Sequence, residues 1–352
     1  MKICVISSID EKVPPDFYGG IGRIVGILAD GLIGRGHDVT LLASGDSKTV
    51  ARLCPIIPKS IGANNPKNVS KVRETFFQMA IAEILEILLK ENFDIISNHF
   101  GWRLVPFGKL LSSPLITTLH TPLDQINKKV IFSAYKKIPV ISISDSQRKA
   151  LPDLNYLKTI YNGIDISLFN FSDTHEDYLA FLGRMSPEKG PGEAIQIATK
   201  LGIKLIMAAA IHDWDRHYFE SKIKQYIDNK KIVFIGEIND KQKNKLLGGA
   251  KALLAPIRWE EPFGLTFIEA MACGTPVVAF NRGAVKEIIV DGKTGIIANS
   301  IAEVCSRFKE INRIKRIDCR RHVEKKFSSI EMVDNYEKAY LEYLKNIHAK
   351  TQ

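Results

Sequence analysis

Short apolar runs rich in β-branched residues alternate with longer segments of helical periodicity along most of the chain. The first half contains KICVIS, HDVTLLAS, FDIISN, SPLITTL and PVISIS, separated by segments such as KVRETFFQMAIAEILEILLK. After YNGIDISLFNFSDTHEDY, which has turn residues and no period, the pattern resumes in YLAFLG, IKLIMAA, KIVFIGE, ALLAPI and TPVVAF. Such alternation predicts βαβ units and parallel sheets. We therefore predict an α/β protein with two Rossmann-like, doubly wound domains.

The length of 352 residues also favours two domains, because one hydrophobic core rarely serves a chain of this size. We predict a first domain at 1–165, a second at 166–328, and a C-terminal helix at 329–352 that packs back on the body. Apolar residues recur in that helix at Met332, Tyr336, Tyr340 and Tyr343. Ligands of open parallel sheets bind outside the carboxyl ends of the strands, so two sheets facing a central cleft predict a site between the domains.

The net charge of +10 favours anionic partners, namely nucleic acid, phosphorylated ligands or an acidic membrane surface. The chain shows no zinc-finger spacing and no RNP-like motif, so we predict no nucleic-acid partner. The stretch MAIAEILEILL is broken by Glu83 and Glu86 and is shorter than the roughly 20 residues that span a bilayer. The N-terminus lacks the features of a signal peptide, which predicts a cytoplasmic location.

Five widely spaced cysteines show neither a CxxC pair nor a metal-binding pattern. They predict core thiols and no metal site. The DxD spacing of Asp213 and Asp215 lacks a recognisable third ligand, so we predict ordinary loop residues there.

The stretch EEPFGLTFIEA combines a helix start with two acidic residues. Pro262 disfavours helix before it, Gly264 allows close approach of the backbone to a ligand, and Leu265 can begin a helix whose free N–H groups bind phosphate. Glu261 then lies in a loop, whereas Glu269 lies inside the helix, where it can accept hydrogen bonds from a ribose diol. The alternative is that both acids only stabilise the positive end of the helix.

Two further stretches predict phosphate binding. In FLGRMSPEKG, Arg184 and Lys189 follow a strand and can offer positive charge to a diphosphate, although a solvated basic loop is the alternative. In DFYGGIGRIVGILADGL, Gly19 and Gly20 precede a helix and permit close approach to phosphate or sugar. A dinucleotide fingerprint would need its third glycine one position before Gly26, so a dehydrogenase fits poorly.

His120 in LITTLHTPLD ends a strand at its carboxyl edge, where ligands of α/β sheets bind. His99 in SNHFGW has the same kind of position with weaker support. A lone histidine is also common as a structural residue, and this alternative stays open for both.

Together, these blocks resemble those of the family 4 glycosyltransferases, which have the two-domain GT-B fold. The most specific part is EPFGLTFIEAMACGTPVVAFNRGAVKEIIVDGKTGIIA, which is similar to the E-x7-E block of that family. GRMSPEKG, YNGID, TLHTP and the YGG segment follow the family order. One departure is Gly22, where the family usually has Glu. The resemblance implies catalytic roles for His120, Arg184, Lys189 and Glu261, and donor binding by Gly19, Gly20, Gly264, Leu265, Thr266 and Glu269.

The function implied is that of a retaining, hexosyltransferase-type enzyme, which moves a sugar from a nucleoside diphosphate to a hydroxyl acceptor without a metal or other cofactor. The acceptor would be a cell-envelope polysaccharide, a glycolipid or a small molecule. The alternatives are a sugar-nucleotide epimerase and a non-catalytic nucleotide-sugar-binding subunit.

The segment INKKVIFSAYKK predicts either peripheral contact with the anionic inner membrane face or a solvated helix face. Membrane contact would bring the protein to a lipid-linked acceptor. The basic residues concerned are Lys128, Lys129, Lys136 and Lys137.

Overall fold

The computed structural model describes residues 1–17, 19–64 and 69–351. The chain forms two compact units: the first comprises Met1–Gly163 and Ser329–Gln352, and the second comprises Ile164–Ser328. Each unit is built around one sheet whose strand pairs are parallel. The prediction of two parallel-sheet α/β domains is therefore confirmed.

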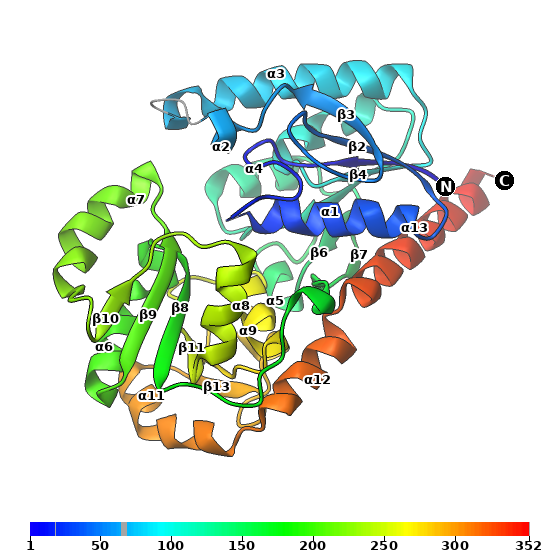
Figure 1. Ribbon diagram of the computed structural model, residues 1–352. Coiled ribbons are helices and arrows are strands. Elements are labelled where there is room, and N and C mark those ends of the chain that lie inside the picture. Colours follow the sequence, from blue (N-terminus) through cyan, green and yellow to red (C-terminus); the bar gives the residue numbers. More distant parts are fainter. Residues whose placement is uncertain (18, 65–68, 352) are drawn as a thin grey trace. The chain divides into compact units, whose positions relative to one another are not determined.

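The sheet of the first unit has the strand order β3-β2-β1-β4-β5-β6-β7. Figure 1 shows this sheet between α3 on one side and α1 on the other, as in a doubly wound fold. Its strands are β1 Lys2–Ile6, β2 Asp38–Ser44, β3 Arg52–Ile57, β4 Ile95–Asn98, β5 Leu115–Leu119, β6 Val140–Ser142 and β7 Tyr156–Thr159. Its helices are α1 Gly20–Ile33, α2 Ile61–Asn64, α3 Val69–Lys90, the 3-10 helix η1 Trp102–Leu110, α4 Ile126–Ala134, α5 Asp145–Arg148 and α13 Ser329–Thr351.

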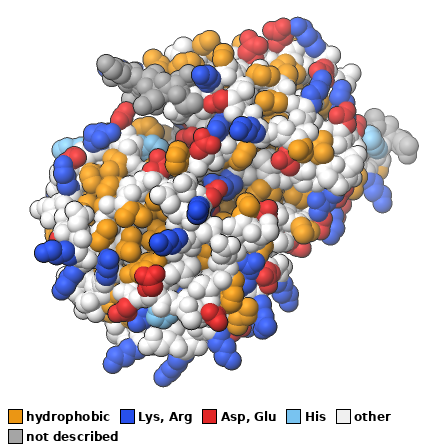
Figure 2. Space-filling model, viewed as in Figure 1, with side chains coloured by type: hydrophobic (Ala, Val, Ile, Leu, Met, Phe, Trp, Pro, Cys, Tyr) orange, Lys and Arg blue, Asp and Glu red, His pale blue; other side chains and the backbone are white. Residues whose placement is uncertain are grey.

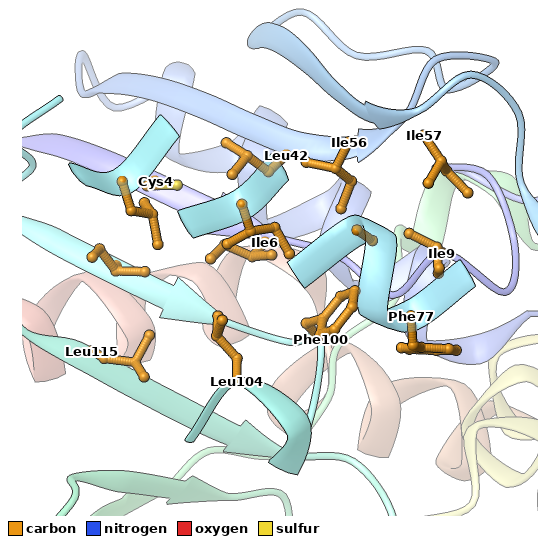
Figure 3. Packing of buried hydrophobic residues seen from close by; sticks show 14 of the residues in the cluster. Cys4, Ile6, Ile9, Leu42, Ile56, Ile57, Phe77, Phe100, Leu104 and Leu115 are labelled. Atoms are coloured by element: carbon orange, nitrogen blue, oxygen red, sulfur yellow. The ribbon is translucent and has the colours of Figure 1, made fainter. Parts of the chain in front are cut away.

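Helix α3 packs an apolar stripe onto the sheet of the first unit. Phe77, Ile84 and Leu88 are buried at helical spacing and belong to one cluster with Ile6 of β1 and Leu42 of β2. Figure 3 shows residues of this cluster from the strands and from α3 pointing toward one another. Burial of such side chains contributes about 1.5–3 kcal/mol each. This packing, together with the glutamates in the same segment, explains why the apolar stretch is a core-facing helix.

Helix α13 follows the second unit in sequence but belongs to the first. Tyr336 and Tyr340 are fully buried, and Met332 is nearly so, as the helical spacing predicted. Tyr343 is only partly buried. Val333 packs against Gly31 of α1, where a Cβ would lie only 2.7 Å from a Val333 methyl carbon. The helix therefore docks closely on α1.

The sheet of the second unit has the strand order β10-β9-β8-β11-β12-β13. Its strands are β8 Tyr178–Arg184, β9 Lys204–Ala210, β10 Ile232–Phe234, β11 Ala252–Ala255, β12 Val277–Phe280 and β13 Gly295–Ala298. Its α-helices are α6 Pro191–Leu201, α7 Asp213–Tyr218, α8 Asp240–Gly249, α9 Leu265–Ala272, α10 Val285–Ile288, α11 Ile301–Arg307 and α12 Arg316–Lys326. Shorter turns are the 3-10 helices η2 Ile166–Leu168, η3 Pro187–Lys189, η5 Lys224–Tyr226 and η6 Phe308–Arg313, and the π-helix η4 Phe219–Ile223.

Three strands, β3, β7 and β13, were not predicted from the sequence. All three lie at an edge of a sheet, and Pro55 interrupts the apolar run of β3. An edge strand pairs on one side only and tolerates proline and polar residues. β3 and β7 therefore lack the continuous apolar run that marks a central parallel strand, and β13 is an apolar run of only four residues. The fourth edge strand, β10, was predicted because KIVFIGE is largely apolar.

The five cysteines are free thiols. Cys4, Cys273 and Cys319 are buried, as predicted for core thiols, whereas Cys54 and Cys305 are only partly buried. Among the described residues, no helix is long and apolar enough to cross a bilayer. Figure 2 shows Lys and Arg side chains interspersed with Asp and Glu over the face in view.

Candidate active site

In the second unit, the strand order reverses between β8 and β11, which pair in parallel. The loops leaving such neighbouring strands run in opposite directions, and the crevice between them is the usual ligand site of an open sheet. Arg184 is the last residue of β8, Lys189 ends η3 just after it, and Glu261 lies in the loop after β11. The fold thus brings these three predicted residues to one edge of the sheet.

The loops after β8 and β11 are joined through their backbones. Arg258 N donates to Glu188 O at 2.8 Å. Gly190 has φ 72°, and a Cβ there would lie only 2.1 Å from the Pro256 carbonyl oxygen, so the close approach requires glycine. These contacts hold the segment that carries Lys189 against the segment that leads to Glu261.

Glu261 is nearly buried and is held by two donors. Lys189 Nζ lies 2.6 Å from Glu261 Oε2, and Trp259 Nε1 donates to the same oxygen at 2.9 Å. Lys189 Nζ also lies 4.6 Å from the centroid of the Trp259 ring. Within the described part of the chain, Glu261 Oε1 makes no hydrogen bond, so it is the oxygen available to a ligand. Glu261 lies in a loop, as predicted.

Arg184 lies between two acidic side chains. It forms an ion pair with Glu188, and its Nε lies 3.1 Å from Asp215 Oδ2. Burial raises the pKa of Asp215, and the charge of Arg184 opposes that rise. Asp215 is a site residue that sequence reasoning missed, because nothing in the DxD spacing indicates its pairing with Arg184.

The prediction that Asp213 and Asp215 are ordinary loop residues is wrong, since both lie in the first turn of α7. Acidic residues are favoured there because the free N–H groups give a helix start a positive potential. Among the described residues, no group of three or more His, Cys, Asp or Glu side chains could hold a metal ion.

Helix α9 begins at Leu265, as predicted, and Gly264 precedes it with φ 96°. A Cβ at Gly264 would lie 2.3 Å from the Phe267 ring, so both backbone angle and space require glycine. Leu265 and Thr266 keep exposed surface in the first turn. The first N–H groups of a helix have no intrahelical acceptor and suit an anion.

Glu269 is buried inside α9 and paired with Lys243 of α8. Lys243 Nζ lies 2.6 Å from Glu269 Oε1 and 3.1 Å from Asp240 Oδ1. This pair holds one oxygen of Glu269 and leaves Oε2 for another partner. Lys243 was not singled out from the sequence, because a lysine in a polar helix gives no signal of a buried ion pair.

In the first unit, Gly19 and Gly20 follow β1 and begin α1, with Gly19 at φ 149° before the helix. A Cβ at Gly19 would lie 2.8 Å from Pro15 Cβ, so the loop and the helix start are in close contact. The strand order of this sheet reverses at β1, and the loop that carries these two glycines leaves the carboxyl end of that strand.

Gly22 lies against the backbone of the same loop. A Cβ there would lie 2.9 Å from the Lys12 carbonyl oxygen. We expect Gly22→Ala to lower the free energy of unfolding by about 1–3 kcal/mol through overpacking. Gly34→Ala, directly after the end of the same helix, is the control, because its Cβ would meet its nearest atom at 3.5 Å with φ −60°. Urea unfolding measures both, and equal midpoints would contradict the packing explanation.

His120 and His99 follow the neighbouring strands β5 and β4 and contact each other, with His120 Nε2 2.7 Å from His99 Nδ1. Burial lowers the pKa of His120 from 6.5 to about 4. Burial, and to a smaller extent the charge of a protonated His120, lowers the pKa of His99 well below its ordinary value. Both rings are therefore neutral near pH 7.

These shifts predict a pH-dependent stability. Between about pH 6.5 and 4, the unfolded chain binds more protons at His120 than the folded chain does, so stability falls as the pH falls through this window. Each unit of pKa shift corresponds to about 1.4 kcal/mol, which predicts a loss of a few kcal/mol. The double variant His99→Asn/His120→Asn should show a shallower decline in urea midpoint across this window. A decline as steep as that of the unchanged protein would contradict the assignment.

The basic segment of α4 differs from its prediction at Lys128. This residue is buried, with Nζ donating to Thr121 Oγ1 at 2.5 Å and to Pro122 O at 2.7 Å. Burial lowers its pKa to about 8. Lys128 is therefore not part of a surface patch, whereas Lys129, Lys136 and Lys137 are exposed. The sequence does not distinguish a lysine that donates to a hydroxyl and a backbone carbonyl from the solvated lysines beside it.

Comparison with known proteins agrees with this architecture. The model of Glycosyltransferase Family 4 matches residues 18–168, and that of Glycosyl transferases group 1 matches residues 167–314. A glycosyltransferase of Methanocaldococcus jannaschii, described as uncharacterized, is 29% identical over 342 residues, with 84% of each chain covered.

Two solved structures show the same fold. The sucrose-phosphate synthase of Thermosynechococcus elongatus superimposes with a TM-score of 0.82 at 17% identity, covering 98% of this chain and 100% of that one. A protein of Anabaena in complex with UDP-glucose gives 0.73 at 18% identity, with 98% and 100% covered. With these neighbours and two family models that together span residues 18–314, the chain belongs to the family 4 glycosyltransferases and has the GT-B fold.

Proposed function

We propose that this glycosyltransferase transfers a sugar from a nucleoside diphosphate donor to a hydroxyl acceptor with retention of the anomeric configuration. The observation that carries the proposal is the convergence of Arg184, Lys189, Glu261 and the start of α9 where the sheet order reverses. The Anabaena neighbour was solved with UDP-glucose, which supports a nucleotide sugar as the donor.

The departing diphosphate is the group that most needs stabilisation, because its negative charge grows as the bond to the sugar breaks. Lys189 and Arg184 supply positive charge, and the first N–H groups of α9, at Leu265 and Thr266, can donate to phosphate oxygens. Both cations are already held by acidic neighbours, so their positions are fixed before the donor binds. These groups can stabilise the leaving diphosphate without a divalent metal.

The two acids of the E-x7-E block have separate proposed roles. Glu261 presents Oε1 toward the donor sugar while Lys189 and Trp259 hold Oε2. Glu269 presents Oε2 toward the ribose while Lys243 holds Oε1. In each case an ion pair orients the carboxylate, and the second oxygen is left to accept from a sugar hydroxyl.

In the first unit, His120 is assigned to the donor sugar, and the loop at Gly19 and Gly20 to the diphosphate and acceptor. Retention follows if the acceptor attacks from the face that the diphosphate leaves, which requires no protein nucleophile. The departing phosphate oxygen can take up the acceptor proton, so that charge and atoms balance.

Release of nucleoside diphosphate from a panel of UDP-, GDP- and ADP-sugars, measured with chelator present, tests this proposal. We expect release from one donor, and its loss in Glu261→Gln, which removes the charge but keeps the shape. Donor binding measured by calorimetry complements the assay. If no donor in the panel binds, the proposal is wrong.

Two alternatives are distinguished by the same assay. An epimerase on this fold would convert the donor without consuming a hydroxyl acceptor, so adding acceptors would not change the rate. A non-catalytic subunit would bind the donor, release nothing, and be indifferent to Glu261→Gln.

A lipid-linked acceptor is favoured by the exposed face of α4. Ile126 is 82% exposed and Val130 is 63% exposed, beside the exposed Lys129. Apolar side chains next to lysines suit the surface of an anionic bilayer. We expect co-sedimentation with anionic vesicles at low salt that weakens at high salt and is lost in Ile126→Ser/Val130→Ser. No sedimentation at low salt would exclude membrane contact.

A further inference from the structure

Within the first unit, a chain of hydrogen bonds leads from His120 to the C-terminal helix. His120 Nε2 lies 2.7 Å from His99 Nδ1, His99 Nε2 lies 2.9 Å from Ser97 Oγ, and Ser97 Oγ lies 2.5 Å from the Tyr340 hydroxyl. Ser97, His99 and Tyr340 are buried, whereas His120 keeps exposed surface. The chain therefore runs from the interior to a single exposed end.

Both histidines are neutral near pH 7, because burial lowers the pKa of each. A neutral imidazole has one nitrogen that donates and one that accepts. Each contact in this hydrogen-bonded chain therefore needs one donor and one acceptor. The Ser97 hydroxyl can donate once and accept twice, but if it accepted from both Tyr340 and His99, its own buried proton would have no acceptor among the described residues. Two arrangements remain. Either every proton points from Tyr340 toward His120, or every proton points the other way.

The buried end of the chain selects between these directions. Ser97 Oγ is the hydrogen-bond partner of the Tyr340 hydroxyl among the described residues, and Tyr340 is fully buried. If Ser97 donated to Tyr340, the phenolic proton would be buried without an acceptor, which is unfavourable. Tyr340 therefore donates to Ser97.

The remaining protons follow from this assignment. Ser97 donates to His99 Nε2, so the proton of His99 is on Nδ1 and is donated to His120 Nε2. The proton of His120 is then on Nδ1, the nitrogen that is not engaged by the chain. Because His120 keeps exposed surface, this N–H lies at the end of the chain that a ligand can reach.

We propose that Ser97 and Tyr340 act as positioning residues, which hold His120 in its Nδ1–H tautomer and so make it a hydrogen-bond donor to an oxygen of the sugar donor. The identity of the ligand as a sugar donor rests on the proposed function, whereas the tautomer of His120 follows from the hydrogen bonds alone. It gives the C-terminal helix a role in the site beyond packing. A donating N–H, unlike a bare ring nitrogen, can hold an oxygen of the bound sugar donor in the position that transfer requires.

Long-range ¹H–¹⁵N correlation spectra of the full chain, labelled at histidine, test the tautomer directly. The spectra of His99→Asn and His120→Asn assign the two rings. We expect both rings to show a protonated Nδ1 and an unprotonated Nε2 at pH 7. A protonated Nε2 on His120 would overturn the proposal, and this outcome requires no variant of Ser97 or Tyr340 to fold.

The double variant Ser97→Ala/Tyr340→Phe removes both hydroxyl groups that set the direction. We expect the His120 nitrogens to move toward averaged shifts, as for a mixture of tautomers. Tyr336→Phe is the matched control, because Tyr336 lies on the same helix, packs against His99 at 5.9 Å between ring centroids, and bonds Thr118 instead. Unchanged ¹⁵N chemical shifts of His120 in a folded double variant, or equal changes in Tyr336→Phe, would contradict the positioning role of Ser97 and Tyr340.

Turnover provides the second readout. In the double variant, we expect kcat for transfer to fall roughly threefold to tenfold, the worth of one hydrogen bond, with little change in donor KM, and no fall in Tyr336→Phe. The spectra, read together with donor binding and turnover, distinguish the proposed function from the inference about the His120 tautomer. Correct tautomers in a protein that binds no nucleotide sugar would refute the proposed function alone, whereas donor turnover with the opposite tautomer would refute only the inference.

Discussion

Replacing Lys189 with alanine is expected to lower the turnover of the sugar donor by about 10² to 10³, the usual cost of removing one group that stabilises charge in a transition state. The donor KM should change much less, because the diphosphate charge that Lys189 faces grows only as the bond to the sugar breaks. Lys224→Ala is the matched control, since that lysine forms an exposed ion pair with Glu220 in the same unit. An effect confined to KM would contradict the assignment.

Lys189 also orients Glu261, so its direct effect must be separated from its effect on that carboxylate. The double-mutant cycle of Lys189→Ala with Glu261→Gln makes this separation. If Lys189 acts on the diphosphate itself, its loss should still slow the Glu261→Gln protein substantially. If the two effects are not additive and Lys189→Ala adds nothing to Glu261→Gln, the lysine works only by positioning Glu261 through their 2.6 Å contact.

Replacing Arg316 with methionine is expected to lower the free energy of unfolding of the second unit by about 3–5 kcal/mol. Arg316 is buried at the start of α12, and its guanidinium donates to carbonyl groups of separate segments. The acceptors are the carbonyl oxygens of Ser172, Gly248, Ala250 and Cys273 and the hydroxyl of Thr275. Without the guanidinium, these buried acceptors lose their donor.

The loss is large relative to a typical total stability of about 5–15 kcal/mol. Urea unfolding followed by tryptophan fluorescence measures it, and Trp214 and Trp259 report on the second unit. Arg313→Met, an exposed arginine three residues earlier, is the control. Arg316→Lys should give an intermediate loss, because an ammonium group has three donors and cannot match the planar arrangement of a guanidinium. Equal midpoints for Arg316→Met and Arg313→Met would contradict the bonding described here.

Some features of the site could be predicted because they depend on the local chain. The start of α9 follows from Pro262 and Gly264, which act through their own backbone angles. Arg184 and Lys189 were found because they lie at and just after the end of a predicted strand, and the carboxyl ends of parallel strands carry the ligand sites. Such signals are visible in one sequence, because each depends on residues only a few positions apart.

Partners that lie far apart in sequence could not be predicted in this way. Packing of whole elements brings Asp215 beside Arg184 and Lys243 beside Glu269. It also places Tyr340 at the buried end of the hydrogen-bonded chain that leads to His120. In the sequence, Lys128 resembles its surface neighbours, and only its hydrogen bonds to Thr121 and Pro122 in the folded chain show that it is buried. In each case the residue type is ordinary and only its neighbours in space make it specific.

Sequence patterns were enough to predict the two α/β units, the central strands and the helix start at the E-x7-E block, because apolar periodicity and backbone preferences act over short stretches. Only the folded structure shows the edge strands β3, β7 and β13, the ion pairs that orient Glu261 and Glu269, and the hydrogen-bonded chain that ends at His120. The physical reason is that burial and hydrogen-bond partners depend on which elements meet, and residues as far as 300 positions apart, such as His37 and Glu337, meet in this fold.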